Sequence, residues 1–202
     1  AATMAFEFSA GETRLVVSCG APDAAPPSWR VAARGTAAHS ALTIEDVNVA
    51  AVRADGGLDR RPAVTAAQGE DQDGRWSKAA HIAYAERFGR LHERALRLSR
   101  DGLTLNGRDR LVGEGGGRFA IRFHLHPDVR ANLSGGGSAV LLRPAHGDGW
   151  RFGLDGARLA LEPSLYWGDG APRKTIQILL SGDAPPGGAE IAWRFVREAR
   201  RR

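Results

Sequence analysis

The stretch Arg118-Phe-Ala-Ile-Arg-Phe-His-Leu-His-Pro-Asp128 alternates apolar and polar residues in the pattern of a β-strand. One side of such a strand carries large apolar residues: Phe119, Ile121, Phe123 and Leu125. The other side carries basic and small residues: Arg118, Ala120, Arg122, His124 and His126. Pro127 ends the pattern, because proline cannot donate a hydrogen bond to a neighbouring strand. We therefore expect a strand with one buried face and one basic face.

Short apolar runs follow this strand at intervals of roughly 8 to 12 residues, a rhythm typical of sandwiches and barrels. The runs cover residues 129–133, 139–142, 150–154, 158–161, 174–180 and 190–196. A chain of 202 residues is long enough to bury the core of one domain, and its 26 glycines suit many turns. The sequence predicts one all-β domain over residues 1–202. Its expected architecture is a large antiparallel two-sheet β-sandwich of the supersandwich type, without substantial helix.

The N-terminal half is less regular. Residues 4–9 and 13–19 predict a hairpin around a turn at Ala10-Gly11. Alternation returns over residues 36–46, with residues 47–53 as an extension, and residues 54–74 are polar and Gly-rich enough for a long excursion.

The segment of residues 76–98 fits both a helical stripe and an extended pattern. Gly89 interrupts the stripe, and the segment runs into a turn at Arg100-Asp101-Gly102. We therefore expect strand rather than helix.

The composition gives a formal net charge of +5, which favours an anionic partner. The basic residues are scattered, and no helix-turn-helix, zinc-finger or RNA-binding motif appears, so we do not expect nucleic acid as a partner. No apolar run approaches a membrane-spanning length, so we do not expect a membrane as a partner either. Cys19 is the single cysteine, which excludes an internal disulfide and a thiolate metal cluster. No Gly-x-Ser-x-Gly elbow, P-loop or dinucleotide fingerprint is present, and the sequence implies no cofactor.

With the strands placed, the sequence resembles the C-terminal β-sandwich domain of heparinase II/III-like polysaccharide lyases. The resemblance runs almost end to end, and its specificity lies in the order and spacing of these segments: Ala5-Phe-Glu-Phe-Ser9, Val17-Ser-Cys-Gly20, Thr36-Ala-Ala-His-Ser-Ala-Leu42, His81-Ile-Ala-Tyr84, Arg122-Phe-His-Leu-His-Pro127, Gly149-Trp-Arg-Phe152, Glu162-Pro-Ser-Leu-Tyr166 and Thr175-Ile-Gln-Ile-Leu-Leu-Ser-Gly182.

The resemblance implies a two-part enzyme in which an N-terminal helical toroid, outside this chain, packs against the sandwich. The acidic polysaccharide lies between the two parts and is cleaved next to a uronic acid by β-elimination. In the family, most of the catalytic groups belong to the toroid, so we expect no catalytic residue in this chain and no activity from the chain by itself. The resemblance also implies a periplasmic location.

Five residues are candidates for substrate binding. Trp29 and Trp167 lie in predicted loops and can stack on sugar rings, while His81 and Tyr84 flank a glycine-containing turn. The alternative for the last two is that they seal the edge of the core. The fifth candidate is His39, expected at the cleft end of its strand, with a satisfied buried histidine as its alternative.

Two histidines of the central stretch, His124 and His126, have a spacing that can chelate a metal, but no third ligand accompanies them, so we expect a structural role. In metal-binding members of the family, the residue at position 39 joins a His at the start of the sandwich and an Asp to hold zinc. Here the Asp position corresponds to Ser18, which is not a zinc ligand. We therefore expect no bound zinc.

Two functions remain open from the sequence. The first is the C-terminal domain of a polysaccharide lyase, forming one wall of the substrate cleft. The second is a non-catalytic carbohydrate-binding or scaffold sandwich, because the same fold can hold a glycan or brace a partner.

Overall fold

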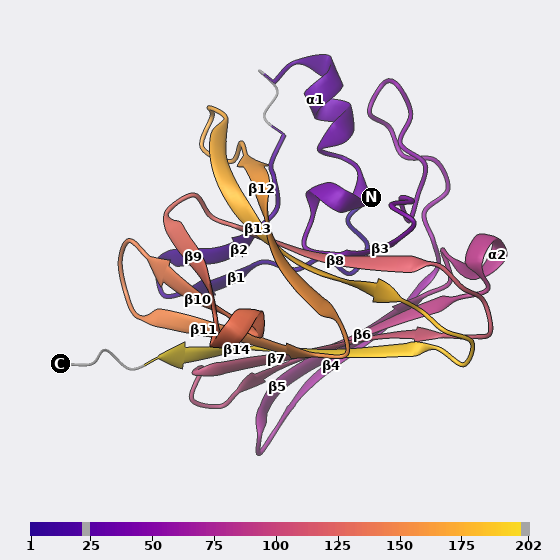
Figure 1. The fold of residues 1–202 in the computed structure, drawn as a ribbon. Coiled ribbons are helices and arrows are strands. Elements are labelled where there is room, and N and C mark those ends of the chain that lie inside the picture. Colours follow the sequence, from indigo (N-terminus) through magenta and orange to yellow (C-terminus); the bar gives the residue numbers. More distant parts are fainter. Residues whose placement is uncertain (22–24, 199–202) are drawn as a thin grey trace.

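Two antiparallel sheets form the domain in the computed structural model, which describes residues 1–21 and 25–198 (Figure 1). Within those residues, the six-stranded sheet has the order β1-β2-β8-β13-β12, with β3 beside β8. Its strands are β1 Phe8–Ala10, β2 Thr13–Val17, β3 Leu42–Ile44, β8 Arg118–Leu125, β12 Arg158–Tyr166 and β13 Arg173–Asp183. The eight-stranded sheet has the order β4-β5-β6-β7-β14-β11-β10-β9. Its strands are β4 Val64–Asp71, β5 Gly74–His81, β6 Leu91–Ser99, β7 Thr104–Val112, β9 Val129–Ser134, β10 Ala139–Pro144, β11 Gly149–Asp155 and β14 Ala189–Glu198.

The predicted central strand is confirmed as β8, which pairs with β2, β3 and β13. Its four apolar residues point into the sandwich and are at most 2% exposed: Phe119, Ile121, Phe123 and Leu125. Burying each such side chain stabilises the fold by roughly 1.5–3 kcal/mol. The predicted two-sheet sandwich is therefore correct, and β8 forms much of its core.

Aromatic rings fill the space between the sheets. The ring centroids of Phe123 and Trp193 are 4.8 Å apart, and those of Phe152 and Phe195 are 4.9 Å apart. Both pairs are in edge-to-face contact. Such pairs contribute about 0.5–1.5 kcal/mol beyond the area they bury. Trp150 is 2% exposed, as its place in a buried strand predicts.

The segment before β4 differs from the prediction. Residues 36–46 contain a short 3-10 helix, Thr36–Ala38, and only the short strand β3. Thr36 explains this, because its hydroxyl accepts a hydrogen bond from the Val49 backbone while its own N–H donates to the Asn48 side chain. These side-chain hydrogen bonds replace the backbone hydrogen bonds of a longer strand, so only the short strand β3 forms.

Two further expectations need correction. Residues 54–74 include all of β4, which pairs with β5 through a tight turn. The strand was not recognised because its residues are mostly exposed and half of them are polar or charged. Trp29, expected in a loop, lies instead in a short helix, α1 Pro27–Ala32, which begins at a proline, where the missing N–H costs no helical bond. Residues 76–98 are extended as expected, apart from one turn of helix, α2 Ala85–Phe88, which ends at Gly89 with φ of 62°.

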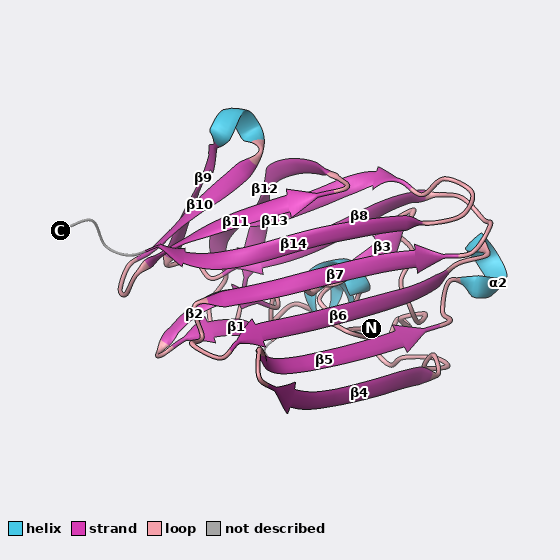
Figure 2. Ribbon diagram, turned by 90° about the horizontal axis from the view of Figure 1, so that it is seen from below, coloured by secondary structure: helices cyan, strands magenta, loops and turns pink. Residues whose placement is uncertain are grey.

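The helix α1 and the N-terminus lie on the outer side of the six-stranded sheet, while the outer face of the eight-stranded sheet is open (Figures 1 and 2). None of the helices in the described part of the chain has the length and apolar character needed to cross a membrane. The two outer faces of the sandwich therefore differ.

Candidate functional site

Three consecutive residues after β2 connect three of the predicted site residues. The Ser18 hydroxyl lies 3.1 Å from His39 Nδ1. The Cys19 carbonyl accepts a 2.6 Å hydrogen bond from the backbone N–H of Trp167. The Gly20 carbonyl accepts a 3.3 Å hydrogen bond from the indole N–H of Trp29. The turn out of β2 therefore assembles a site from segments that are distant in the sequence.

The backbone geometry after β2 requires glycine at position 20. Its φ is +77°, a conformation that L side chains rarely adopt, and an added Cβ would lie 2.9 Å from the carbonyl carbon of Trp167. The backbone of residue 20 can approach Trp167 this closely only without a side chain.

Trp29 and Trp167 form an aromatic pair with half-buried rings. Their ring centroids are 5.7 Å apart and the planes are inclined by 40°. The Trp167 indole N–H donates to the Gly170 carbonyl at 3.2 Å, which fixes its orientation. Tryptophan rings that keep an exposed face can stack on the apolar faces of sugar rings.

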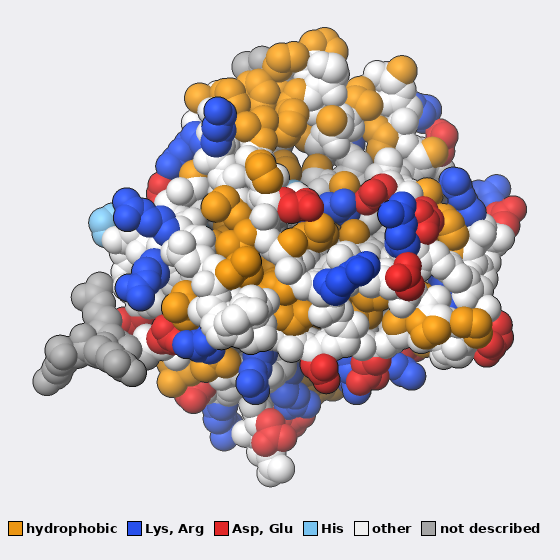
Figure 3. All heavy atoms as spheres, in the orientation of Figure 1, with side chains coloured by type: hydrophobic (Ala, Val, Ile, Leu, Met, Phe, Trp, Pro, Cys, Tyr) orange, Lys and Arg blue, Asp and Glu red, His pale blue; other side chains and the backbone are white. Residues whose placement is uncertain are grey.

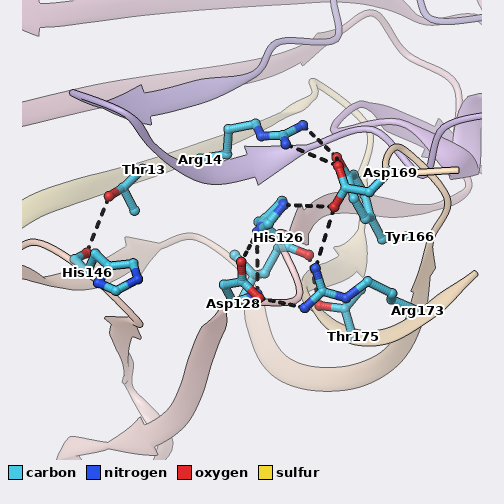
Figure 4. A network of polar contacts seen from close by, with 10 residues as sticks. Thr13, Arg14, His126, Asp128, His146, Tyr166, Asp169, Arg173 and Thr175 are labelled. Carbon is cyan, nitrogen blue, oxygen red and sulfur yellow. Dashed lines mark hydrogen bonds and ion pairs between the residues drawn. The ribbon is translucent and has the colours of Figure 1, made fainter. Parts of the chain in front are cut away.

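A polar network fixes the loop that carries Trp167 (Figure 4). Asp169 accepts hydrogen bonds from Arg14 at 3.1 Å and from the Tyr166 hydroxyl at 3.3 Å. Arg14 also donates to the Tyr166 oxygen at 2.7 Å, and Arg173 donates to Asp169 at 3.5 Å. Although burial opposes it, hydrogen bonding and charge from Arg14 hold the pKa of Asp169 below its usual value. The carboxylate thus ties β2, β12 and β13 together beside the aromatic pair.

His39 lies at the edge of this region, half-buried. Burial lowers its pKa, while Glu7 opposes the shift. The imidazole is therefore uncharged at neutral pH and can accept or donate one hydrogen bond at each nitrogen.

A family model described as heparinase II/III-like, C-terminal, matches residues 1–194. The chain belongs to this family. FtsZ-localized protein C of Caulobacter vibrioides is 32% identical to it over 219 residues, an alignment that covers 96% of this chain and 36% of that protein.

Two solved structures share the fold of this heparinase-like domain. The heparinase III BT4657 gene product superimposes with a TM-score of 0.77 at 13% identity, covering 96% of this chain and 30% of that chain. The heparan sulfate lyase HepC from Pedobacter heparinus gives a TM-score of 0.76 at 16% identity, covering 98% of this chain and 30% of that chain. The domain thus spans about a third of the length of the proteins that it matches.

The donor set around His39 does not fit the zinc site of the family's metal-binding members. Its Nδ1 faces the Ser18 hydroxyl, which is not a zinc ligand. The described residues contain no group of three or more His, Cys, Asp or Glu side chains placed to hold a metal ion.

His81 and Tyr84 lie inside the heparinase-like domain, each 1% exposed. The Tyr84 hydroxyl lies 3.1 Å from the carbonyl oxygens of both Leu42 and Val47, and burial raises its pKa. The structure does not bring these two residues to the aromatic pair. Their burial supports the alternative role of sealing the core and gives no support to direct contact with a polymer.

His124 and His126 do not share a site. His124 Nε2 lies 2.9 Å from the Ala37 carbonyl and Nδ1 lies 2.8 Å from the Ser164 hydroxyl, under the segment that covers β8. Burial lowers the pKa of His124 to about 4. His126 packs against the Tyr166 ring at 4.9 Å and accepts a bond from the backbone of Asp128.

Sequence reasoning missed the network around Asp169. Arg14 and Tyr166 are 152 residues apart in the sequence, so no local spacing relates them. The available signal was the presence of Tyr166, Trp167, Asp169 and Arg173 within eight residues of a Gly-rich turn, which a turn alone does not require.

Proposed function

We propose that this heparinase-like domain forms one wall of the substrate cleft of a lyase that cleaves uronate-containing polysaccharide by β-elimination. The observation that carries the proposal is the grouping of Trp29, Trp167 and His39 around residues 18–20, in a chain that belongs to this family. A sugar polymer needs stacking surfaces and a few fixed hydrogen-bonding groups, and this region offers both.

Each residue has a distinct role in the proposal. The exposed faces of Trp29 and Trp167 carry the apolar faces of two sugar rings, and the neutral His39 hydrogen-bonds a hydroxyl. In β-elimination, a base removes the proton next to the uronate carboxylate while an acid protonates the leaving oxygen. Those proton transfers are assigned to the helical toroid, so this chain alone binds polymer without cleaving it.

The toroid is proposed to dock over α1. Hydrophobic side chains gather on the surface over α1 and beside the neighbouring ends of β12 and β13 (Figure 3). An apolar area next to a polar site is typical of the contact between domains of one protein. The proposal includes the periplasmic location expected for the family, which cell fractionation tests.

The test uses the full-length natural protein with heparan-type, chondroitin-type and alginate-type polymers, following the ultraviolet absorbance of the unsaturated product. The proposal predicts that absorbance rises with at least one polymer. The variant Trp29→Ala should then raise KM more than it lowers kcat, whereas Leu133→Ala, which removes an exposed apolar residue in another part of the sandwich, should change neither. No absorbance with any uronate polymer refutes the proposal.

A second candidate is the non-catalytic scaffold. The 32% identity to FtsZ-localized protein C exceeds the 13–16% identity to the two heparinase structures, and this observation favours a role at the sites that FtsZ occupies. In that case the same surface braces a partner rather than a substrate. A fluorescent fusion of the full-length protein decides between the two: co-localisation with FtsZ, without lyase activity, supports the scaffold.

A further inference from the structure

The eight-stranded sheet lies on the side of the sandwich away from α1 (Figures 1 and 2), and its outer face is lined by two hollows. The first has a volume of about 400 Å³ and crosses β4, β5, β6 and β7. The second has a volume of about 890 Å³ and extends from β7 across β14 and β11 to β10. Both involve β7, so together they extend across most of the sheet.

Strand register places four cations in a zigzag over this face. Lys78 and Arg108 flank Ala95 in one row across β5, β6 and β7. Arg97 and Arg194 flank Asn106 in the next row, across β6, β7 and β14. Neighbouring strands are about 4.8 Å apart, so the two cations of each row are separated by roughly 10 Å. We call Lys78, Arg97, Arg108 and Arg194 the basic stripe.

Small residues form the floor around the basic stripe. They are Gly69, Ala80, Ala95, Gly153 and Ala192. Trp76 lies over Gly69, where an added Cβ would come within 2.8 Å of the indole. Because short side chains lie between the long cationic side chains, this face forms a trough with charged sides. The Trp76 ring lies at the β5 end of the trough.

Acidic residues beside the cations are paired with arginines, including Glu190 with Arg108 of the stripe at 4.0 Å, while Asp155 lines the second hollow and accepts a hydrogen bond from the Gly156 backbone. Glu93 accepts a 2.9 Å hydrogen bond from Arg110, and Glu190 lies 3.3 Å from the same arginine. Asp71 pairs with Arg97 at 2.6 Å. Among the described residues, neither Lys78 nor Arg194 forms an ion pair. The Lys78 ammonium contacts an aromatic ring instead, 5.5 Å from the centre of the Trp76 ring. The stripe therefore keeps positive charge for an outside partner.

We propose that the basic stripe binds an anionic polysaccharide, as a binding surface separate from the one beside His39. A trough with repeated cations suits one extended chain that carries carboxylate or sulfate groups at regular intervals. A membrane surface fits less well, because the large exposed apolar residues lie outside the stripe: Val64, Ile82, Leu103, Val112 and Leu133. The inference rests on the proposed function only for the class of polymer.

The stripe extends across the strands, so a bound chain would cross the sheet from β5 to β14. Such a surface would hold the polymer near the enzyme while another part of the same chain is cut, which raises its local concentration by multivalency.

The test measures binding of the 202-residue chain to alginate oligomers, with neutral dextran, single-stranded DNA and phosphatidylglycerol vesicles as competing probes. The variant Lys78→Glu with Arg194→Glu should weaken alginate binding about tenfold or more. The matched control Arg87→Glu with Arg158→Glu makes the same change of charge at exposed positions outside the stripe and should weaken it less than twofold. Circular dichroism checks that the variants are folded. The milder pair Lys78→Gln with Arg194→Gln removes the two charges without reversing them.

Equal weakening by the stripe and control variants would overturn the inference, since it would mean that only net charge matters. Tighter binding of DNA or vesicles than of alginate would overturn it as well. The variant Trp29→Ala separates this inference from the proposed function: stripe-dependent alginate binding that survives Trp29→Ala supports a second surface. Absence of elimination by the full-length protein, with stripe-dependent binding intact, contradicts only the lyase proposal.

Discussion

His92 Nε2 lies 2.7 Å from the Asp109 carboxylate, inside the sandwich and closed off from solvent. The proton positions follow from the bonds on either side. The Ala83 backbone N–H donates to His81 Nδ1, so a neutral His81 carries its proton on Nε2 and donates it to His92 Nδ1 at 3.2 Å. His92 then carries its proton on Nε2 and donates to Asp109.

Arg94 completes this buried network. It donates to both Asp109 oxygens at 2.8 and 3.1 Å, and to the carbonyl oxygens of Met4 and Ser40 at 2.9 Å each. Burial alone would raise the pKa of Asp109, but Arg94 and His92 outweigh it and hold the pKa well below its usual range. Through Ser40 the network reaches the residue next to His39, so the core supports the candidate site.

Asp109→Asn should be strongly destabilising. The change leaves the Arg94 charge buried without a counter-charge and weakens the bonds from His92 and Trp193, which breaks a buried ion pair at a cost of about 3–5 kcal/mol. Urea unfolding at pH 7.5 measures this loss. Asp73→Asn, at an exposed turn, serves as control and should stay within about 0.5 kcal/mol of the parent. A loss below about 1 kcal/mol for Asp109→Asn would contradict the assigned network.

Stability should fall in mildly acidic solution. Burial lowers the pKa of His81 to about 3 and that of His124 to about 4, and burial also lowers the pKa of His92. Each unfolded histidine has a pKa near 6.5, so the unfolded chain binds more protons than the folded chain below that pH. The free energy of unfolding is therefore highest above about pH 6.5 and decreases as the pH falls towards 4.

Urea titrations between pH 7.5 and 4 measure this slope. His81→Gln should flatten it, because one proton-linked group is lost. An unfolding free energy that is constant over this range would show that the histidines are not buried in the neutral form.

Gly20→Ala should cost more than a comparable change elsewhere. Gly20 and Gly102 both have positive φ, of +77° and +70°, so alanine at either site carries similar backbone strain of about 1–3 kcal/mol. Only at Gly20 would the new methyl group meet another backbone, that of Trp167; nothing lies within 4 Å at Gly102. The difference between the two losses in thermal unfolding isolates the close approach. Equal losses would mean that Trp167 is not held against residue 20.

Asp169→Asn should disturb the aromatic pair with little effect on stability. The ion pairs of Asp169 with Arg14 and Arg173 are partly exposed, so their loss should cost less than about 1 kcal/mol. Because Asp169 fixes the loop after Tyr166, the near-ultraviolet circular dichroism of Trp29 and Trp167 should change. Asp183→Asn, at an exposed position in β13, should leave the spectrum as it is.

The local sequence determined the strands. Alternation over Phe119 to Leu125 sets which face of β8 is buried, because side chains of an extended chain point to opposite sides in turn. The same reasoning gave β9 to β14 and the all-β class, and Gly89 correctly favoured strands over a long helix between residues 76 and 98. It failed for β4, whose exposed residues carry no hydrophobic signal, and at Thr36, whose side-chain bonds replace a strand.

Only the tertiary structure decided the sites. Trp29 meets Trp167, and Arg14 meets Tyr166, because the order β2-β8-β13-β12 places β2 and β12, which are far apart in the sequence, in one sheet. The basic stripe likewise depends on register between β5, β6, β7 and β14, and His81 is buried because it faces His92 and Asp109 rather than solvent. Pairing between distant strands is set by the packing of the whole sandwich, so no local period in the sequence specifies it.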